Sequence, residues 1–423
     1  MSIRRMLPIV VLLCAAPAAA QDAPPTIRAR SRVVTITDGL HVKKNYWYVM
    51  PERRPDVYYV EVPLAPHRLT FATDLESISF DVSYGVRHAF VVRLEDGTEA
   101  LTEIRAEFRN LLQYERSSAA GDGADVIPFT LGDNDQIYVR GRLNGGAPLS
   151  LQVDFGAGGS LIKKSSVPKA NIAFDGTITL RNSDGVNEVQ SSSHNRLEIE
   201  GLVWRDVPFA VADNMTHRED ALVGNSLFLD RVVEINYQRM ALIIHGERPA
   251  LGQEWRRQDM YLDGGTVPFT RGVLSVSGAS QAGWFLLDTG AYTSILNSPR
   301  LSSTTKMAGE VRRLLGPLGG YRSDVSVAIG DEEFQAINYS TRAYDGNPAS
   351  LGVLGNDVLK RFDLVLDNRQ GVLFLRPNHQ RADSFRNPER MLSRMSALLL
   401  VGAVLALAWF SVRLAPAGIR TRR

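Results

Sequence analysis

The strongest constraint on the fold is an internal duplication centred on two aspartates. One copy, residues 149–162, runs from an apolar strand through Asp154 into a glycine turn and then to an aliphatic pair. The other copy, residues 285–296, has the same order around Asp288. A buried strand and the N–H groups of a glycine turn are the kind of support that fixes a catalytic carboxylate. Two such segments in one chain predict two carboxylates that meet across a pseudo-twofold axis.

The duplication extends beyond the aspartates. Similar tetrapeptides, 127–130 (IPFT) and 267–270 (VPFT), open the two copies, and a strand hairpin is predicted between each of them and its Asp turn. Downstream, each copy repeats an aliphatic pair followed by Gly and Asn, ending at Asn225 and at Asn356. A short helix and a closing strand are predicted after both. The duplication therefore assigns residues 127–250 to a first lobe and residues 265–377 to a second.

Over residues 125–377 these motifs resemble those of bilobal aspartic peptidases of the pepsin and retropepsin-like class. Residues 288–291 (DTGA) match the signature of that family fully, whereas residues 154–157 (DFGA) depart from it at Phe155. The resemblance implies an all-β fold of two lobes, double-ψ or acid-protease-like β-barrels, with a substrate cleft between them. It assigns catalysis to Asp154 and Asp288. The residues predicted to support the active-site turns are Gly156, Ala157, Thr289, Gly290 and Ala291.

The chemistry requires two carboxyl groups. At a separation of about 3 Å both cannot ionise, so they share one proton. The charged member then activates water and the protonated member polarises the scissile carbonyl group. Ala157 and Ala291 stand where many relatives have a serine. Without that hydroxyl donor the charged form is less stabilised, so the pair is expected to work closer to neutral pH than the acid enzymes do.

Phe155 permits two interpretations. In the family, threonine hydroxyls of both lobes brace the two turns against each other, and here only Thr289 has one. Either an aromatic ring packed under the first turn replaces half of the brace, or the first lobe has lost its catalytic function. The retention of both aspartates and both glycines favours an active enzyme.

A hairpin that covers the cleft is predicted in the second lobe, at Gly319, Gly320 and Tyr321, because clustered glycines permit both the turn and its closure. The counterpart in the first lobe is residues 182–185. Either segment is equally compatible with an ordinary surface hairpin.

The N-terminus has two predicted parts before the lobes. Residues 1–20 have the basic start, apolar run and small-residue end of a signal peptide, and they contain the only cysteine, Cys14. Residues 21–118 alternate as short strands, which predicts a small β domain, and residues 119–126 are a predicted linker. A turn at 95–97 favours a strand over residues 102–108, although a helical period fits there too.

The C-terminus contains an uncharged apolar run, residues 396–412, flanked by arginines. A transmembrane helix is the favoured interpretation, and a buried helix or a cleaved sorting tail are the alternatives. Residues 378–395 are then a tether and residues 413–423 a basic cytoplasmic tail. The catalytic lobes would be anchored in the inner membrane and face the periplasm or the cell exterior.

Charge and composition exclude other classes of function. A net charge of +2 with scattered basic pairs gives no reason to expect a nucleic-acid partner, and the 7 histidines lack metal-ligand spacing. No cofactor and no metal are expected. The predicted function is a membrane-anchored exported endopeptidase that cleaves a protein or peptide substrate, with a monomer sufficient because one chain carries both motifs. The alternative is an inactive module of the same fold that binds a peptide or protein.

Overall fold

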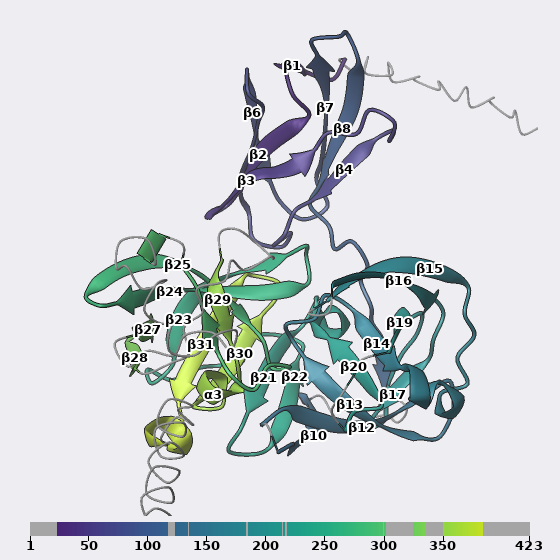
Figure 1. Ribbon diagram of the computed structural model, residues 1–423, viewed down its shortest axis with the longest axis vertical. Helices are drawn as coiled ribbons and strands as arrows, with labels where there is room; N and C mark the ends of the chain where they lie inside the picture. Colours follow the sequence, from purple (N-terminus) through teal and green to yellow (C-terminus); the bar gives the residue numbers. More distant parts are fainter. Residues whose placement is uncertain are drawn as a thin grey trace, which may run out of the picture.

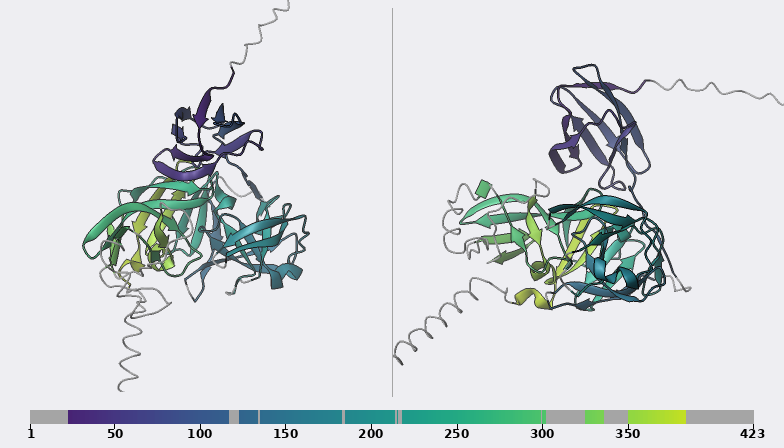
Figure 2. Two further views of the ribbon diagram at one scale, coloured as in Figure 1. Left: turned by 45° about the horizontal axis from the view of Figure 1, so that its top comes forward. Right: turned by 45° about the vertical axis from the view of Figure 1, so that its right-hand side comes forward.

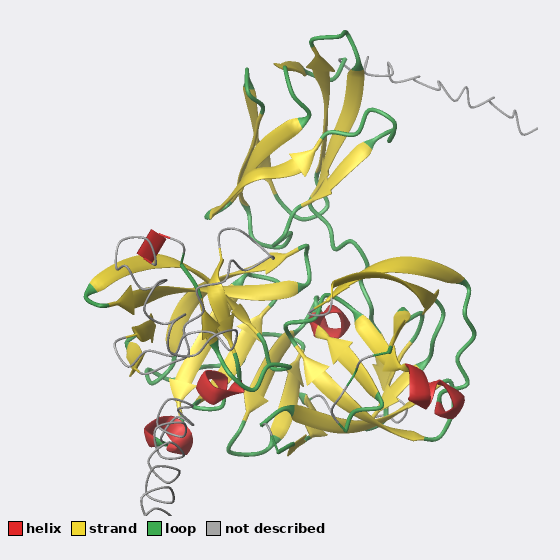
Figure 3. Ribbon diagram, in the orientation of Figure 1, coloured by secondary structure: helices red, strands yellow, loops and turns green. Residues whose placement is uncertain are grey.

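Short apolar and alternating segments dominate the chain, and the structure is accordingly almost all β (Figure 3). The computed structural model describes residues 23–116, 123–133, 135–182, 185–213, 215, 218–298, 300–301, 325–335 and 350–383. The predicted signal peptide, transmembrane helix and basic tail lie outside these ranges. Within them, no helix is long and apolar enough to cross a membrane.

The N-terminal domain consists of two four-stranded sheets, seen at the top of Figure 1. In order across the sheets, the strands of the first are β1 (Thr26–Ala29), β7 (Arg87–Leu94), β8 (Glu99–Arg105) and β4 (Asp56–Tyr59). Those of the second are β3 (His41–Tyr48), β2 (Val33–Asp38), β5 (His67–Ala72) and β6 (Ser77–Val82). A separate apolar core, containing Phe71 and Phe90, holds the domain together. The strand interpretation of the segment after the 95–97 turn is confirmed by β8.

The first lobe is an 11-stranded sheet built around the strand that ends at Asp154. Its path begins with β15 (Gly176–Asn182), β16 (Gly185–Ser192), β19 (Phe209–Ala212), β14 (Ser160–Lys163) and β20 (Ala221–Gly224). It continues through β13 (Pro148–Asp154), β12 (Ile137–Leu143), β17 (Leu197–Ile199), β18 (Leu202–Trp204) and β9 (Tyr114–Arg116), while β11 (Thr130–Leu131) pairs with β12. The 3-10 helices are η1 (Lys164–Lys169) and η2 (Asn225–Phe228). Although β9 lies within the range predicted for the N-terminal domain, it pairs with the lobe.

The second lobe repeats this plan around the strand that precedes Asp288. Its elements are β23 (Arg256–Asp263), β24 (Val267–Val276), β25 (Ala279–Leu287), β26 (Ile295–Leu296), β27 (Val325–Ile329), β28 (Glu332–Gln335), β29 (Ser350–Leu354) and α3 (Asn356–Leu359).

The antiparallel part of a 12-stranded sheet, which continues from β23 into β24 of the second lobe, joins the lobes. Its order is β10 (Asp125–Pro128), β22 (Ala241–His245), β21 (Val232–Asn236), β30 (Phe362–Asp367), β31 (Val372–Pro377) and β23, and η4 (His379–Ala382) follows β31. The closing strands of the two copies, β21 and β30, pair with each other at the middle of this sheet. A local twofold axis therefore passes between them, as the duplication predicts.

The predicted alignment of the two copies was wrong at their start. β10 pairs with β22 as β23 pairs with β31, so the counterpart of residues 127–130 is β23 rather than residues 267–270. Residues 267–270 begin β24, the neighbour of the Asp-bearing strand β25, and their counterpart is the start of β12. Short apolar tetrapeptides carry too little information to fix a register, which is decided by pairing partners far along the chain.

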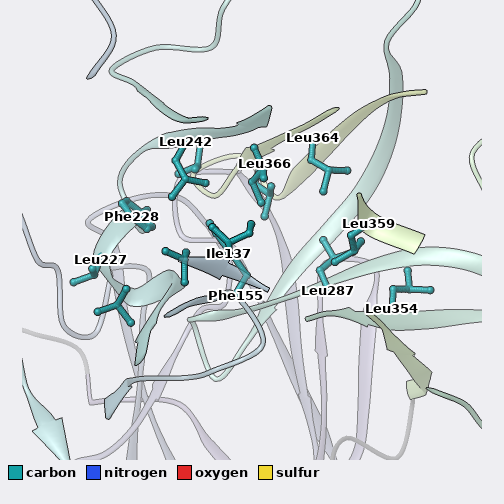
Figure 4. Close-up of a cluster of buried hydrophobic side chains, with 14 of the residues drawn as sticks. Ile137, Phe155, Leu227, Phe228, Leu242, Leu287, Leu354, Leu359, Leu364 and Leu366 are labelled. Atoms are coloured by element: carbon teal, nitrogen blue, oxygen red, sulfur yellow. The ribbon is translucent and has the colours of Figure 1, made fainter. Parts of the chain in front are cut away.

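A single apolar cluster runs through both lobes and the shared sheet. Figure 4 shows Phe155 and Ile137 of the first lobe in the same cluster as Leu287 and Leu354 of the second. Two further views show the N-terminal domain as a separate body against the lobes (Figure 2). Because the lobes share one core, the two Asp turns are held in fixed relation to each other.

Candidate active site

Three neighbouring strands of a sheet position each aspartate. In the first lobe β20 is the middle strand, parallel to β13 and antiparallel to β14, and Asp154 at the end of β13 lies beside Gly224. In the second lobe β29 has the same relation to β25 and β26, and the main-chain N–H of Asp288 donates to the Leu354 carbonyl at 3.0 Å. Both carboxylates therefore emerge from strands whose apolar side chains are buried in the core.

The glycine after each aliphatic pair is required by contact with the turn. A Cβ at Gly224 would lie 2.4 Å from the Ala157 carbonyl oxygen, and one at Gly355 would lie 2.9 Å from the Ala291 oxygen. Because the main chains approach so closely, no side chain fits at either position. The glycine of the aliphatic-aliphatic-glycine pattern thus allows its strand to pack directly on the main chain of the Asp turn.

The two turns face each other so closely that each aspartate packs on the glycine of the other turn. A Cβ placed on Gly156 would lie 2.5 Å from Asp288 Cγ, and one on Gly290 would lie 2.4 Å from Asp154 Cγ. Both aspartates retain partial solvent access. The structure therefore brings together the carboxylates that the sequence predicted would pair.

Main-chain donors reach the two carboxylates unequally. Asp154 Oδ1 accepts a hydrogen bond from the Gly156 N–H at 2.8 Å. Asp288 Oδ1 accepts two, from the N–H groups of Gly290 and Ala291, both at 2.9 Å. Burial, followed by the charge of Asp288, holds the pKa of Asp154 well above its usual range. Burial also raises the pKa of Asp288, but the N–H donors oppose that rise. The main-chain donors therefore favour Asp288 as the ionised member of the pair.

Thr289 braces the turns from the second lobe. Its buried hydroxyl accepts a hydrogen bond from the Phe155 N–H at 3.0 Å and donates one to the Val153 carbonyl at 2.9 Å. Both partners belong to the first lobe. The half of the brace that the sequence retains is thus formed.

Phe155 lies in the core of the first lobe, where its ring stacks on Phe228 with the centroids 6.0 Å apart (Figure 4). Its side chain is 1% exposed. The aromatic ring is therefore packed beneath the first turn, where it cannot supply the hydroxyl that Thr289 supplies from the other side.

Sequence reasoning missed several polar side chains around the second turn. Gln136 and Gln152 donate to the Gly290 carbonyl oxygen at 3.2 and 3.4 Å. Asn356 donates to the Thr289 carbonyl at 2.7 Å and accepts a hydrogen bond from the Tyr237 hydroxyl at 2.9 Å. Two of them had a local signal. Gln152 lies two residues before Asp154 and so on the same face of the strand, and Asn356 ends the repeated aliphatic-aliphatic-Gly-Asn motif, to which no role was assigned.

The predicted flap residues Gly319, Gly320 and Tyr321 lie outside the described ranges. The first-lobe counterpart is the β15–β16 ribbon, an edge hairpin whose Ile178 and Val186 are 45% and 56% exposed. Apolar side chains exposed on an edge ribbon are compatible with contact to a bound chain. Among the described residues, no cluster of His, Cys, Asp and Glu has a metal-binding arrangement.

Three comparisons with known proteins were made, and two of them found similarities. No curated protein matches the chain. The solved structure of the aspartic proteinase from Irpex lacteus matches with 12% sequence identity and a TM-score of 0.46, covering 62% of this chain and 100% of that one. The model of the aspartyl protease family matches residues 139–227, which include the first Asp turn and its supporting glycine. The chain is therefore similar to the aspartyl protease family over residues 139–227.

Proposed function

We propose that this protein is an endopeptidase that hydrolyses peptide bonds with a water molecule activated by Asp154 and Asp288. The observation that carries the proposal is the packing of each aspartate on the glycine of the opposite turn. This contact places two carboxylates at one point of the molecule and keeps them partly accessible. A pair of carboxyl groups that share one proton is a general acid and a general base in a single site.

We assign the two roles from the unequal main-chain donors. Asp288, with two main-chain N–H donors, is the ionised member. It removes a proton from water while the water oxygen attacks the scissile carbonyl carbon. Asp154, which holds the proton, donates a hydrogen bond to the carbonyl oxygen and stabilises the negative charge that develops there. When the C–N bond breaks, the leaving nitrogen takes up the proton that came from water.

The rival function is peptide binding without cleavage, and it rests on Phe155. Against it stand the retained half of the brace, in which Thr289 holds Phe155 and Val153, and the proximity of both acids. Phenylalanine at position 155, the counterpart of Thr289, leaves the brace without one hydroxyl, whereas loss of either acid would remove the general acid or base itself.

Export and membrane anchoring are also part of the proposal. They rest on the composition of residues 1–20 and 396–412. In this arrangement the two lobes act on protein or peptide substrates outside the cytoplasm, close to the membrane that holds the C-terminus.

Cleavage of denatured casein by the purified full chain between pH 3 and 8 tests the proposal. The wild type should produce new N-termini, Asp288→Asn should produce none, and Asp213→Asn should match the wild type because Asp213 lies on the surface, paired with Lys164. If the wild type is inert at every pH yet retains casein peptides, the binding function replaces the peptidase. Equal cleavage by the wild type and Asp288→Asn would overturn the assignment of the acid pair.

A further inference from the structure

Two glutamine side chains of the first lobe meet at one atom of the second Asp turn. Gln136 Nε2 and Gln152 Nε2 lie 3.2 and 3.4 Å from the Gly290 carbonyl oxygen, and both residues are buried, at 2% and 4% exposure. A carbonyl oxygen has two lone pairs and can accept both hydrogen bonds. Buried amides are costly unless they are bonded, so these contacts hold their donors in place.

The acceptor belongs to the peptide group that serves Asp288. The Gly290 carbonyl and the Ala291 N–H are the two ends of one planar peptide unit. That N–H donates to Asp288 Oδ1 at 2.9 Å. Donors on the oxygen therefore fix the orientation of the N–H, and they also polarise the unit so that the N–H is a stronger donor.

The local twofold axis supplies an internal comparison. Tyr138 pairs with Gln152 in the first lobe as Phe269 pairs with Leu286 in the second. The counterparts of Gln152 and Gln136 are therefore Leu286 and Val267, which are apolar. At these two pairs of positions, the lobe that has Phe155 carries amides and the lobe that has Thr289 carries apolar residues.

The direction of the brace explains this distribution. Thr289 reaches from the second lobe to the main chain of the first turn. By symmetry, a threonine at position 155 would reach from the first lobe to the second turn, and Phe155 instead points into its own core. Gln136 and Gln152 start in the first lobe and end on the second turn, so they join the same two parts by another route.

We propose that Gln136 and Gln152 are positioning residues that replace the missing first-lobe hydroxyl, holding the Gly290–Ala291 peptide so that its N–H supports the ionised Asp288. The catalytic consequence rests on the proposed peptidase function. The effect on the Asp288 carboxylate does not, because it follows from hydrogen bonds within the protein. Burial raises the pKa of Asp288 and the Ala291 N–H is the largest influence that lowers it, so weakening this donor should raise that pKa further.

The test replaces both glutamines by methionine, which has a similar length and shape but no donor. Leu286→Met, at the counterpart position, is the matched control because it exchanges side chains of similar volume. Carbon-13 NMR of carboxyl-labelled aspartate in the full chain, with the signal assigned through Asp288→Asn, measures the titration of Asp288. Cleavage of casein-derived peptides measures kcat and KM.

For Gln136→Met/Gln152→Met we expect the Asp288 titration and the acidic limb of kcat to move to higher pH, with kcat lower by roughly tenfold and KM little changed. The control should match the wild type. If the double variant does not fold, either single variant should show a smaller shift in the same direction. An unchanged Asp288 titration in a folded variant would overturn the inference, and an inert wild type with a shifted titration would overturn only the peptidase function.

Discussion

At the residue scale, the site depends on two glycines that are selected by contact rather than by backbone conformation. Neither Gly156 nor Gly290 has a positive φ. Each is needed because the carboxylate of the opposite lobe occupies the space of its absent side chain. A motif that is usually described as a turn is thus also half of an interface between two lobes.

A single methyl group at this interface should remove activity. Gly290→Ala places a Cβ within 2.8 Å of three Asp154 atoms. Displacing a reacting group by about 1 Å costs on the order of 10²-fold in rate, so we expect at least that loss. Gly159→Ala is the control, because a Cβ there meets nothing within 4 Å. Wild-type cleavage of casein by Gly290→Ala would contradict the contact described here.

The raised pKa of Asp154 leads to a second prediction, which concerns stability. The pKa of Asp154 is higher in the folded chain than in the unfolded one, so the folded state binds its proton more tightly. Its contribution to stability is fully present below the unfolded pKa and is lost as the pH rises through the folded pKa. Asn cannot ionise. We therefore expect the Tm of Asp154→Asn to exceed that of the wild type at pH 8. The difference should be about 2–4 °C for each kcal/mol of unfolding free energy that the ionised carboxylate costs the wild type, and it should shrink toward pH 4.

The same pair of melting curves for Asp213→Asn provides the control, because that carboxylate lies on the surface and is paired with Lys164. A Tm difference for Asp154→Asn that is constant from pH 4 to 8 would be inconsistent with a raised pKa at this position.

At the element scale, the Asp turns are joined by main-chain contacts that side chains complete. Thr289 is the clearest case, because its hydroxyl bonds an N–H and a C=O of the opposite lobe, both near the buried end of β13. Thr289→Val keeps the shape and leaves both groups without this partner. Each unsatisfied buried group costs about 1–3 kcal/mol, so a loss on the order of 2–4 kcal/mol is expected in urea unfolding. Thr289→Ser, which keeps the hydroxyl, should lose much less; equal losses would show that the hydroxyl does not brace the turns.

The elements that carry the aspartates were predictable from sequence, and their tertiary partners were not. The strand, Asp turn and downstream glycine are encoded in contiguous residues and appear twice, which is why Asp154 and Asp288 were found. Gln136 contacts Gly290, 154 positions away, and no local pattern signals such a contact. The start of each lobe was misaligned for the same reason, because strand register depends on pairing across the whole shared sheet.

At the scale of the whole molecule, the N-terminal domain is docked on the second lobe through a buried polar cluster. His41, 1% exposed, stacks on Tyr261 with centroids 3.8 Å apart and meets the edge of Trp284. Lys43 forms ion pairs with Glu61 of its own domain and with Asp263 of the lobe. A cavity of about 160 Å³ adjoins this cluster. The sequence predicted the domain, but nothing in it indicated where the domain docks.

This interface should weaken in acid. Burial, with a further contribution from the Lys43 charge and opposed by Asp38, lowers the pKa of His41 to about 4. Glu61 and Asp263 also carry charge at the cluster, and Asp38 is paired with His67. Since the folded pKa is depressed, the stabilisation is present above the ordinary value of 6.5 and is lost as the pH falls toward 4.

Small-angle scattering should therefore show the full chain expanding between pH 6.5 and 4 as the domain separates. His41→Phe keeps an aromatic ring against Tyr261 without the titration and should expand less over this range. His194→Phe, at an exposed histidine, should behave as the wild type does. Identical expansion of the His41 and His194 variants would refute a role for His41.

The most direct test of the central claim is the pH dependence of kcat for one peptide bond, measured with a quenched peptide taken from a casein cleavage site. We predict a bell-shaped profile for the wild type and losses of about 10²–10⁴-fold or more in both Asp154→Asn and Asp288→Asn. Retention of the wild-type rate by either variant would contradict the claim that the two aspartates act as one catalytic pair.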